Sequence, residues 1–384
     1  MGARLAEPSD DPQKTVHLET DMRDLDRRRF LAGLLAAPVL PPALSAGPRT
    51  KHDASAAAGT LDIHVHLVGI GDNGSGCRLS KTVTSGAPFQ ILSRTLGIRR
   101  RAATFDEGYV LALAEFMRDS GPDKCGLLAF DAVYGGNGKP DWRNTHFYVP
   151  NDYVFEVAAR FPQQIVPCVS VNPDRADAMD ELDRCVEKGA RGLKLLAPTQ
   201  GTNLADKRHT RFFRRCAERH VLLIVHSGHE HAVPVLDNKL GHPRKLELAL
   251  DQGCTVVACH CGTNYPKEYP KTLPEYLKML REYPNLYGDS AALARFNKLD
   301  DFRRLLADDL ARRRLVHGSD FPVPCQPWAF TRDVGRLSVF RLRRVRNPMA
   351  KDFALKKLLG VGRASAERGY RLLCGSSDED QRST

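Results

Sequence analysis

Eight short apolar segments recur along the chain, and a stretch with helical spacing separates each segment from the next. Short segments rich in Val, Ile and Leu are typical of strands buried on both faces of a parallel sheet. Eight strand–helix units predict a (β/α)8 TIM barrel, and a doubly wound sheet is the alternative. The expected strands are residues 61–67, 126–133, 165–171, 192–196, 221–226, 255–260, 286–289 and 315–318.

Apolar side chains between these strands recur at the spacing of a single helix face. The barrel is expected to occupy residues 60–374, followed by a polar tail at 375–384. Three helix faces stand out, made of Met179, Leu182 and Val186; of Phe213, Cys216, Ala217 and His220; and of Leu299, Phe302, Leu305 and Leu306.

Composition and charge limit the classes of partner. Apolar residues are 42% and charged residues 27% of the 384, which excludes wholesale disorder. The net charge of +11 attracts anions, but no zinc-finger, RNP-type or helix-turn-helix pattern accompanies it. The densest basic run, residues 336–346, is interpreted as a solvated face or a rim near an acidic substrate. We expect a small-molecule substrate and no nucleic acid; a homodimer is compatible with the sequence.

Residues 1–60 do not look like a domain. Arg27-Arg28-Arg29-Phe30-Leu31 and the modest apolar run after it resemble a twin-arginine export signal. Residues 1–45 are therefore predicted to be a leader, cleaved after Ser45, and residues 46–59 a linker. The predicted location is periplasmic or secreted, and cytoplasmic if the leader is not used. The apolar run, residues 30–44, is too short to span a bilayer and contains three prolines, so we expect no stable membrane insertion.

Two motifs in the chain invite other interpretations. Residues 69–74 match G-x-G-x-x-G, but no helix opens at the third glycine and no acid follows at the required distance. A flexible loop over the barrel mouth is expected instead, within a long first βα connection at 68–104. Cys259-His260-Cys261 suggests zinc, but alternation along a strand would point the imidazole away from both sulfurs. The ten cysteines are scattered and are expected mostly in the core.

Polar side chains stand where several of the expected strands end. His64 and His66 are two apart on the first strand and therefore share a face. His226, His260 and Asp320 end or follow the fifth, sixth and eighth strands. Barrel active sites lie at the carboxyl ends of the strands, so these groups should meet. Imidazoles together with a carboxylate suit a divalent metal ion.

The motifs resemble those of the metal-dependent amidohydrolase superfamily, in the branch that includes aminocarboxymuconate semialdehyde decarboxylase-like enzymes. The resemblance covers residues 60–374 and implies one divalent metal, zinc or a similar ion such as manganese. It implies His64, His66, His226 and Asp320 as its ligands, with His260 beside it. The matching segments are Asp62-Ile-His64-Val-His66, Gly192-Leu-Lys194-Leu, Val225-His226-Ser-Gly, Ala258-Cys-His260-Cys-Gly, Tyr287-Gly-Asp289 and His317-Gly-Ser-Asp320-Phe-Pro.

The same resemblance suggests roles for these groups. Asp320 would accept the proton of an activated water, and His260 would stabilise developing charge. Lys194 either bridges a second metal, as in some branches, or holds an anionic substrate or pairs with an acid. His229 and Arg295 follow the fifth and seventh strands and are weaker candidates for substrate binding, as cations near the mouth would suit a carboxylate.

Three functions remain open from the sequence. The first is a metal-dependent hydrolase of an amide, ester or lactone bond in a small molecule. The second is a non-oxidative decarboxylase of an aromatic or muconate-like acid, which would use the same ligands. The third is a metal-binding scaffold without activity, which the complete set of expected ligands disfavours.

Overall fold

The computed structural model describes residues 59–264 and 272–375. The predicted export leader lies outside the described residues. So do the predicted linker, apart from Gly59, and the predicted tail, apart from Gly375.

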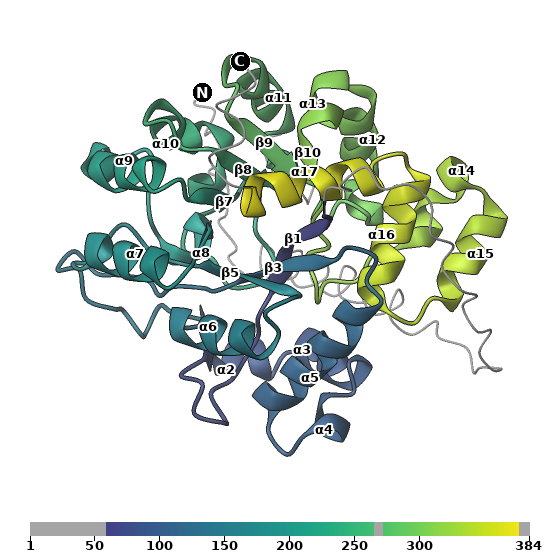
Figure 1. The fold of residues 1–384 in the computed structure, drawn as a ribbon, viewed down its shortest axis with the longest axis horizontal. Coiled ribbons are helices and arrows are strands. Elements are labelled where there is room, and N and C mark those ends of the chain that lie inside the picture. The colour runs from purple at the N-terminus through teal and green to yellow at the C-terminus, as the bar shows by residue number, and fades with distance from the viewer. Residues whose placement is uncertain (1–58, 265–271, 376–384) are drawn as a thin grey trace, which may run out of the picture. The chain divides into compact units, whose positions relative to one another are not determined.

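The described residues form a barrel of eight parallel strands with helices around it (Figure 1). Strand order follows chain order, which rules out the doubly wound alternative. The last strand joins the first through backbone hydrogen bonds, His66 N to Phe321 O at 2.9 Å and Asp320 N to His64 O at 3.0 Å. The TIM-barrel prediction is confirmed. The barrel strands are β1 (Leu61–His66), β3 (Lys124–Leu128), β5 (Ile165–Val169), β6 (Gly192–Leu195), β7 (Leu222–His226), β8 (Val256–Cys259), β9 (Leu286–Asp289) and β10 (Leu315–Val316).

Helices connect these strands and cover the barrel. The expected faces of residues 179–186 and 299–306 lie on α7 (Ala178–Glu187) and α12 (Leu299–Ala307). The third expected face ends early because α9 (Thr210–Glu218) stops at Glu218. His220 lies beyond it with a φ of 52°, in the left-handed region. The helices are α2 (Lys81–Thr84), α3 (Ala87–Thr95), α4 (Ile98–Arg101), α5 (Phe105–Arg118), α6 (Asn151–Arg160), α7 (Ala178–Glu187), α8 (Ala197–Gln200), α9 (Thr210–Glu218), α10 (Glu247–Asp251), α11 (Leu273–Glu282), α12 (Leu299–Ala307), α13 (Asp309–Arg314), α14 (Thr331–Val334), α15 (Arg336–Arg344), α16 (Pro348–Leu358) and α17 (Gly362–Cys374).

The sixth expected strand is shorter than predicted, with consequences for the Cys-His-Cys motif. β8 ends at Cys259, and residues 260–262 form a 3-10 turn. His260 and Cys261 have φ values of 60° and 53°, so the alternation assumed for this motif does not extend through it. The turn directs the His260 ring toward the carboxyl end of the barrel, where it contacts the rings of His64 and His226.

The first βα connection carries structure of its own. It contains α2 to α4 and β2 (Arg78–Leu79), which pairs with β4 (Phe147–Tyr148). Asp72 accepts hydrogen bonds from the backbone N–H groups of Phe105 and Asp106 at the start of α5. Asp106 in turn accepts from Ile70 N and Gly71 N. The glycine-rich segment is therefore bound to α5, rather than being the flexible loop predicted. No helix begins at Gly74, as a phosphate site of this motif would need, and the N-terminus of α5 is occupied by the Asp72 carboxylate.

An apolar layer fills the interior of the barrel beneath its carboxyl end. Leu373 of α17 is buried there with Leu61 and Ile63 of β1. Gly126 of β3 and Gly192 of β6 leave the space its methyl groups occupy, since an added Cβ at either position would lie 3.1–3.2 Å from them. Figure 1 shows α17 lying across the strands. Within the described ranges, no helix is both long and apolar enough to cross a membrane.

Candidate metal centre

The first strand and the segment after the last strand bring three polar side chains together. His64 Nε2 lies 3.2 Å from His66 Nε2, and Asp320 Oδ1 lies 3.2 Å from the first and 3.0 Å from the second. A register irregularity in β1 between Asp62 and Val65 lets Ile63 join the apolar interior while both histidines reach the cluster. These three groups could hold a metal ion.

The backbone at Asp320 is strained, which is characteristic of functional sites. Its φ is 63°, in the left-handed region that residues other than glycine seldom adopt. Hydrogen bonds of Asp320 N to His64 O and of Val323 N to Asp320 O hold this conformation. His260 has a similar φ, so two of the predicted site residues share this strain.

Asp289 at the end of β9 orients His64. Its Oδ2 lies 2.7 Å from His64 Nδ1, and its Oδ1 accepts a hydrogen bond from His260 N at 2.7 Å. Burial opposes the ionisation of Asp289, but the His64 imidazole beside it holds the pKa of this carboxyl below its usual range. An anionic partner on Nδ1 leaves Nε2 of His64 to face the cluster, as in metal-ligating histidines.

His226 ends β7 in a similar arrangement. Its Nδ1 lies 3.5 Å from Glu230 Oε2, and its Nε2 is buried without a hydrogen-bond partner. The His260 ring lies 4.9 Å from the His226 ring and 5.3 Å from the His64 ring, centroid to centroid, and its Nδ1 lies 2.9 Å from Ala291 O. A buried nitrogen without a partner is costly unless something binds it.

Burial and neighbouring charges favour the protonation states in which these groups can bind a metal ion. Burial and the neighbouring Lys194 lower the pKa of His64 to about 3, and burial lowers the pKa of His226 well below its usual value. Burial opposes the charge of Asp320, but the His64 and His66 rings lower the pKa of this carboxyl below its usual range. Neutral imidazoles beside an ionised carboxylate fit a divalent cation.

Lys194 of β6 points into the centre of the barrel. Its Nζ lies 3.1 Å from His64 Nε2 and 3.2 Å from Cys259 Sγ, and the residue is 1% exposed. His64, Cys259 and Asp289 form a second group with metal-ligand spacing. Cys259 was expected to be a plain core residue; it does pack among apolar side chains, and it also borders the polar cluster. Within the described residues, eight of the ten cysteines are buried, as predicted.

Two buried cations flank the cluster on the β9 side. Arg295 is 8% exposed and Lys298 is 5% exposed, and the Lys298 Nζ donates to Thr263 O at 2.9 Å. The charge of Lys298 acts on both His226 and Asp320, and that of Arg295 acts on Asp320. His229 lies farther along the β7 loop, where its Nε2 is 3.0 Å from Asn238 Nδ2.

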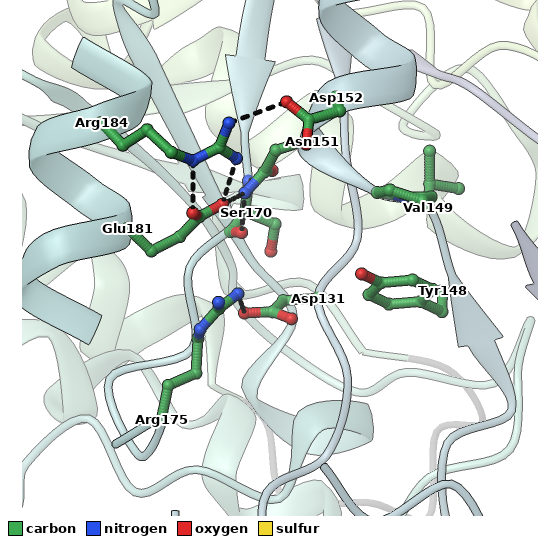
Figure 2. A pocket seen from close by; sticks show the side chains of 10 residues that line it. Asp131, Tyr148, Val149, Asn151, Asp152, Ser170, Arg175, Glu181 and Arg184 are labelled. Carbon is green, nitrogen blue, oxygen red and sulfur yellow. Dashed lines mark hydrogen bonds and ion pairs between the residues drawn. The ribbon is translucent and has the colours of Figure 1, made fainter. Parts of the chain in front are cut away.

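A separate polar cavity of about 410 Å³ opens between α6 and α7. Figure 2 shows that its charged side chains face one another: Arg175 contacts Asp131, and Arg184 binds Glu181 and Asp152. No residue that lines this cavity belongs to the histidine–aspartate cluster. The cavity and the cluster are therefore two separate features of the described residues.

The match to a family model decides which family this barrel represents. Residues 61–354 match the model described as amidohydrolase. The chain belongs to the amidohydrolase family. This confirms the resemblance drawn from the motifs. A search of curated proteins finds no match to this amidohydrolase.

Solved structures similar to this amidohydrolase include an uncharacterised TIM-barrel protein from Bordetella bronchiseptica, at 17% identity and a TM-score of 0.49, covering 78% of this chain and 99% of the other. Another is a 2,6-dihydroxybenzoate decarboxylase from Rhizobium, at 14% identity and a TM-score of 0.46, covering 82% and 99%. A third is a manganese-bound 5-carboxyvanillate decarboxylase from Novosphingobium aromaticivorans, at 13% identity and a TM-score of 0.44, covering 84% and 100%.

Sequence reasoning assigned no role to several residues that border the cluster of this amidohydrolase. Asp289 ends a strand as the other polar groups do, so the same rule could have found it. Glu230 and Lys298 gave no such signal, because each lies in a connection after a strand and reaches the site only through the path of its loop.

Proposed function

We propose that this amidohydrolase is a metal-dependent hydrolase that acts on a small molecule bearing a carboxylate. One observation carries the metal site: the buried His226 Nε2 has no partner while its ring faces His260 and, through it, His64. His64, His66, His226 and Asp320 would hold the ion. When bound, such an ion supplies Lewis-acid polarisation and lowers the pKa of a water toward about 7.

The protein groups divide the remaining work. Asp320, kept ionised beside two imidazoles, can accept the proton released when water attacks. His260 donates Nδ1–H to Ala291 O, which leaves its Nε2 to contact a substrate oxygen on which charge develops. Asp289 and Glu230 fix the rings of His64 and His226 in the required orientations.

Two buried cations support a carboxylate on the substrate. Arg295 and Lys298 lie close enough for their charges to act on Asp320, and burial removes competing water from both. A carboxylate bound between them would sit at hydrogen-bonding distance of positive groups in a low-dielectric setting, where such pairs are strongest. Lys194 is a further candidate, although its ammonium lies deeper, between His64 and Cys259.

The same cations favour a second candidate, the decarboxylation of an aromatic or muconate-like acid. In that reaction the bound carboxylate would itself leave as CO₂. Arg295 and Lys298, beside Asp320, would bind it before the carbon–carbon bond breaks. Both reactions need the same metal ligands. Hydrolysis breaks an amide, ester or lactone bond and keeps the carboxylate, whereas decarboxylation removes the carboxylate.

One experiment separates the two reactions. The metal-loaded protein is incubated in ¹⁸O-water with carboxylate-bearing lactones, esters and amides, and with aromatic carboxylic acids. Hydrolysis places one ¹⁸O in the organic product, whereas decarboxylation releases CO₂ and leaves an organic product that has gained a proton and no oxygen from water. The variants His226→Ala and Asp320→Asn should lose both turnover and metal while keeping a helical circular dichroism spectrum. His146→Gln, a substitution outside the cluster, should keep all three, and full turnover by the first two variants would refute the site.

A further inference from the structure

Helix α15 (Arg336–Arg344) presents an unusual outer surface. Val339 and Leu342 are buried and attach the helix to the body of the protein. Leu337 and Phe340 stand on the opposite side at 62% and 51% exposure. At about 100° per residue, Leu337 and Arg344 lie directly opposite the buried pair, with Phe340 and Arg341 on either side. The outermost face of α15 therefore alternates apolar and cationic side chains. Figure 1 places α15 at the periphery of the barrel.

The charge around this face has a single sign. From residue 334 to residue 351 the sequence contains six cations and no acid. Five arginines of this stretch are exposed, and within the described ranges none of them forms an ion pair: Arg336, Arg341, Arg343, Arg344 and Arg346. Asp333, before the helix, is bound to Arg303 at 2.9 Å. Asp352, after it, is buried and bound to Lys356 at 2.6 Å. Neither flanking acid therefore neutralises the face.

Two side chains on the face are arranged so that charge and apolar surface lie together. The guanidinium carbon of Arg344 lies 4.2 Å from the centroid of the Phe340 ring. This cation–π contact keeps the aromatic ring and the charge at the same height above the helix. A surface of this kind offers shallow apolar insertion and headgroup contacts at the same time, as interfacial helices do.

We infer that the α15 face docks this protein peripherally on an anionic phospholipid surface. Leu337 and Phe340 would enter the interfacial layer, and Arg341 and Arg344 would bind the phosphate groups around them. Charge complementarity selects this occupant. A twofold contact between two copies through this face would bring arginines against arginines. A nucleic acid would satisfy the arginines but would leave Leu337 and Phe340 exposed.

The test is cosedimentation of the full metal-loaded chain with large unilamellar vesicles at 0.1 M salt. One set contains phosphatidylcholine alone and the other contains 30% phosphatidylglycerol. Binding is expected to the second set, and Arg341→Gln with Arg344→Gln should weaken the partition coefficient about 30-fold, since each cation near such a surface contributes about fivefold. Leu337→Ser with Phe340→Ser should weaken it about tenfold or more.

Matched controls remove the same charge and the same apolar groups elsewhere. Arg211→Gln with Arg214→Gln takes two exposed cations from α9, and Leu111→Ser with Leu358→Ser takes two exposed leucines. Both controls should bind like the parent. Every variant carries the same N-terminal segment, so differences between variants report on α15.

Four outcomes would overturn the inference. The first is the absence of binding to anionic vesicles, and the second is binding that both α15 double variants leave unchanged. The third is a dimer, detected by analytical ultracentrifugation, that Leu337→Ser with Phe340→Ser dissociates, which would assign the face to a second copy. The fourth is tighter binding to a 20-base-pair duplex than to vesicles, lost on arginine substitution alone, which would assign the face to nucleic acid.

Discussion

His226 and Glu230 are paired through one ring nitrogen of the histidine, at 3.5 Å, while the other ring nitrogen is buried without a partner. A carboxylate on one side of an imidazole fixes its tautomer and raises its basicity toward a ligand on the other side. The pairing of His64 with Asp289, at 2.7 Å, follows the same pattern. Two histidines from opposite parts of the barrel are thus prepared in the same way.

Glu230 should therefore control metal affinity without touching the metal. Glu230→Gln is expected to weaken zinc binding roughly 10- to 100-fold, as loss of such outer partners usually does. Competition with a chromophoric chelator measures this. Glu218→Gln removes a carboxylate of α9 that is 57% exposed and should leave the affinity unchanged. Equal affinity in both variants would mean that Glu230 does not orient a ligand.

The number of metal ions that the proposed site binds should depend on Lys194. Its Nζ lies between His64 Nε2 and Cys259 Sγ, where an ammonium group would repel a second cation. We expect elemental analysis to give one divalent ion per chain, lost in His64→Ala. Two ions per chain would instead make Lys194 a bridging ligand. No ion after reconstitution with zinc or manganese would leave the barrel without the basis for either proposed reaction.

Much of this arrangement was predictable from the sequence because two repeating patterns specify it, the apolar runs and the polar residues that end them. Apolar runs of strand length predicted the barrel. The polar residues at the carboxyl ends of these runs are His64, His66, His226 and Asp320, and the carboxyl ends of barrel strands meet at one edge. The prediction that was wrong, strand alternation through the Cys-His-Cys motif, depended on a backbone conformation that the apolar pattern does not encode. His260 leaves the strand through a positive φ, so alternation gave the wrong geometry for its neighbours.

The contribution of the loops was out of reach for a different reason. The Asp72 carboxylate accepts from the backbone at the start of α5, and the Asp106 carboxylate accepts from Ile70 N and Gly71 N. These bonds span more than thirty residues, and no local pattern specifies them. Lys298 and Glu230 enter the site from connections whose course is fixed by tertiary packing. Such residues become candidates only once the chain path is known.

In the proposed function, Lys298 should make the binding of a carboxylate substrate depend on pH. Burial and, to a smaller extent, the nearby Arg295 lower the pKa of this lysine to about 8, against the opposing charges of Asp301, Glu230 and Asp320. Below pH 8 the side chain is a cation, and above pH 8 it is neutral. KM for a carboxylate substrate should therefore rise as the pH passes through 8.

Lys298→Met should raise KM at pH 7 roughly tenfold, the effect of losing one charged hydrogen bond, and should abolish the rise near pH 8. Steady-state kinetics from pH 6.5 to 9.5 measures both. Lys139→Met, on an exposed loop, serves as the control and should keep the parent profile. A rise in KM that persists in Lys298→Met would assign the titration to another group.

The opposite end of the barrel should determine stability rather than activity. Leu373 is 3% exposed, packs in the apolar interior and fills the space left by Gly126 and Gly192. Leu373→Ala is expected to lower the free energy of unfolding by about 2–5 kcal/mol, because the glycines around it cannot move in to fill the cavity. Leu358→Ala, at 51% exposure on α16, should change it by no more than about 0.5 kcal/mol. Urea denaturation measures both values. Since Leu373 packs in the apolar layer with Leu61 and Ile63, the affinity for zinc at the proposed site should stay at the parent value. A loss of metal together with stability would show that the two ends of the barrel are coupled.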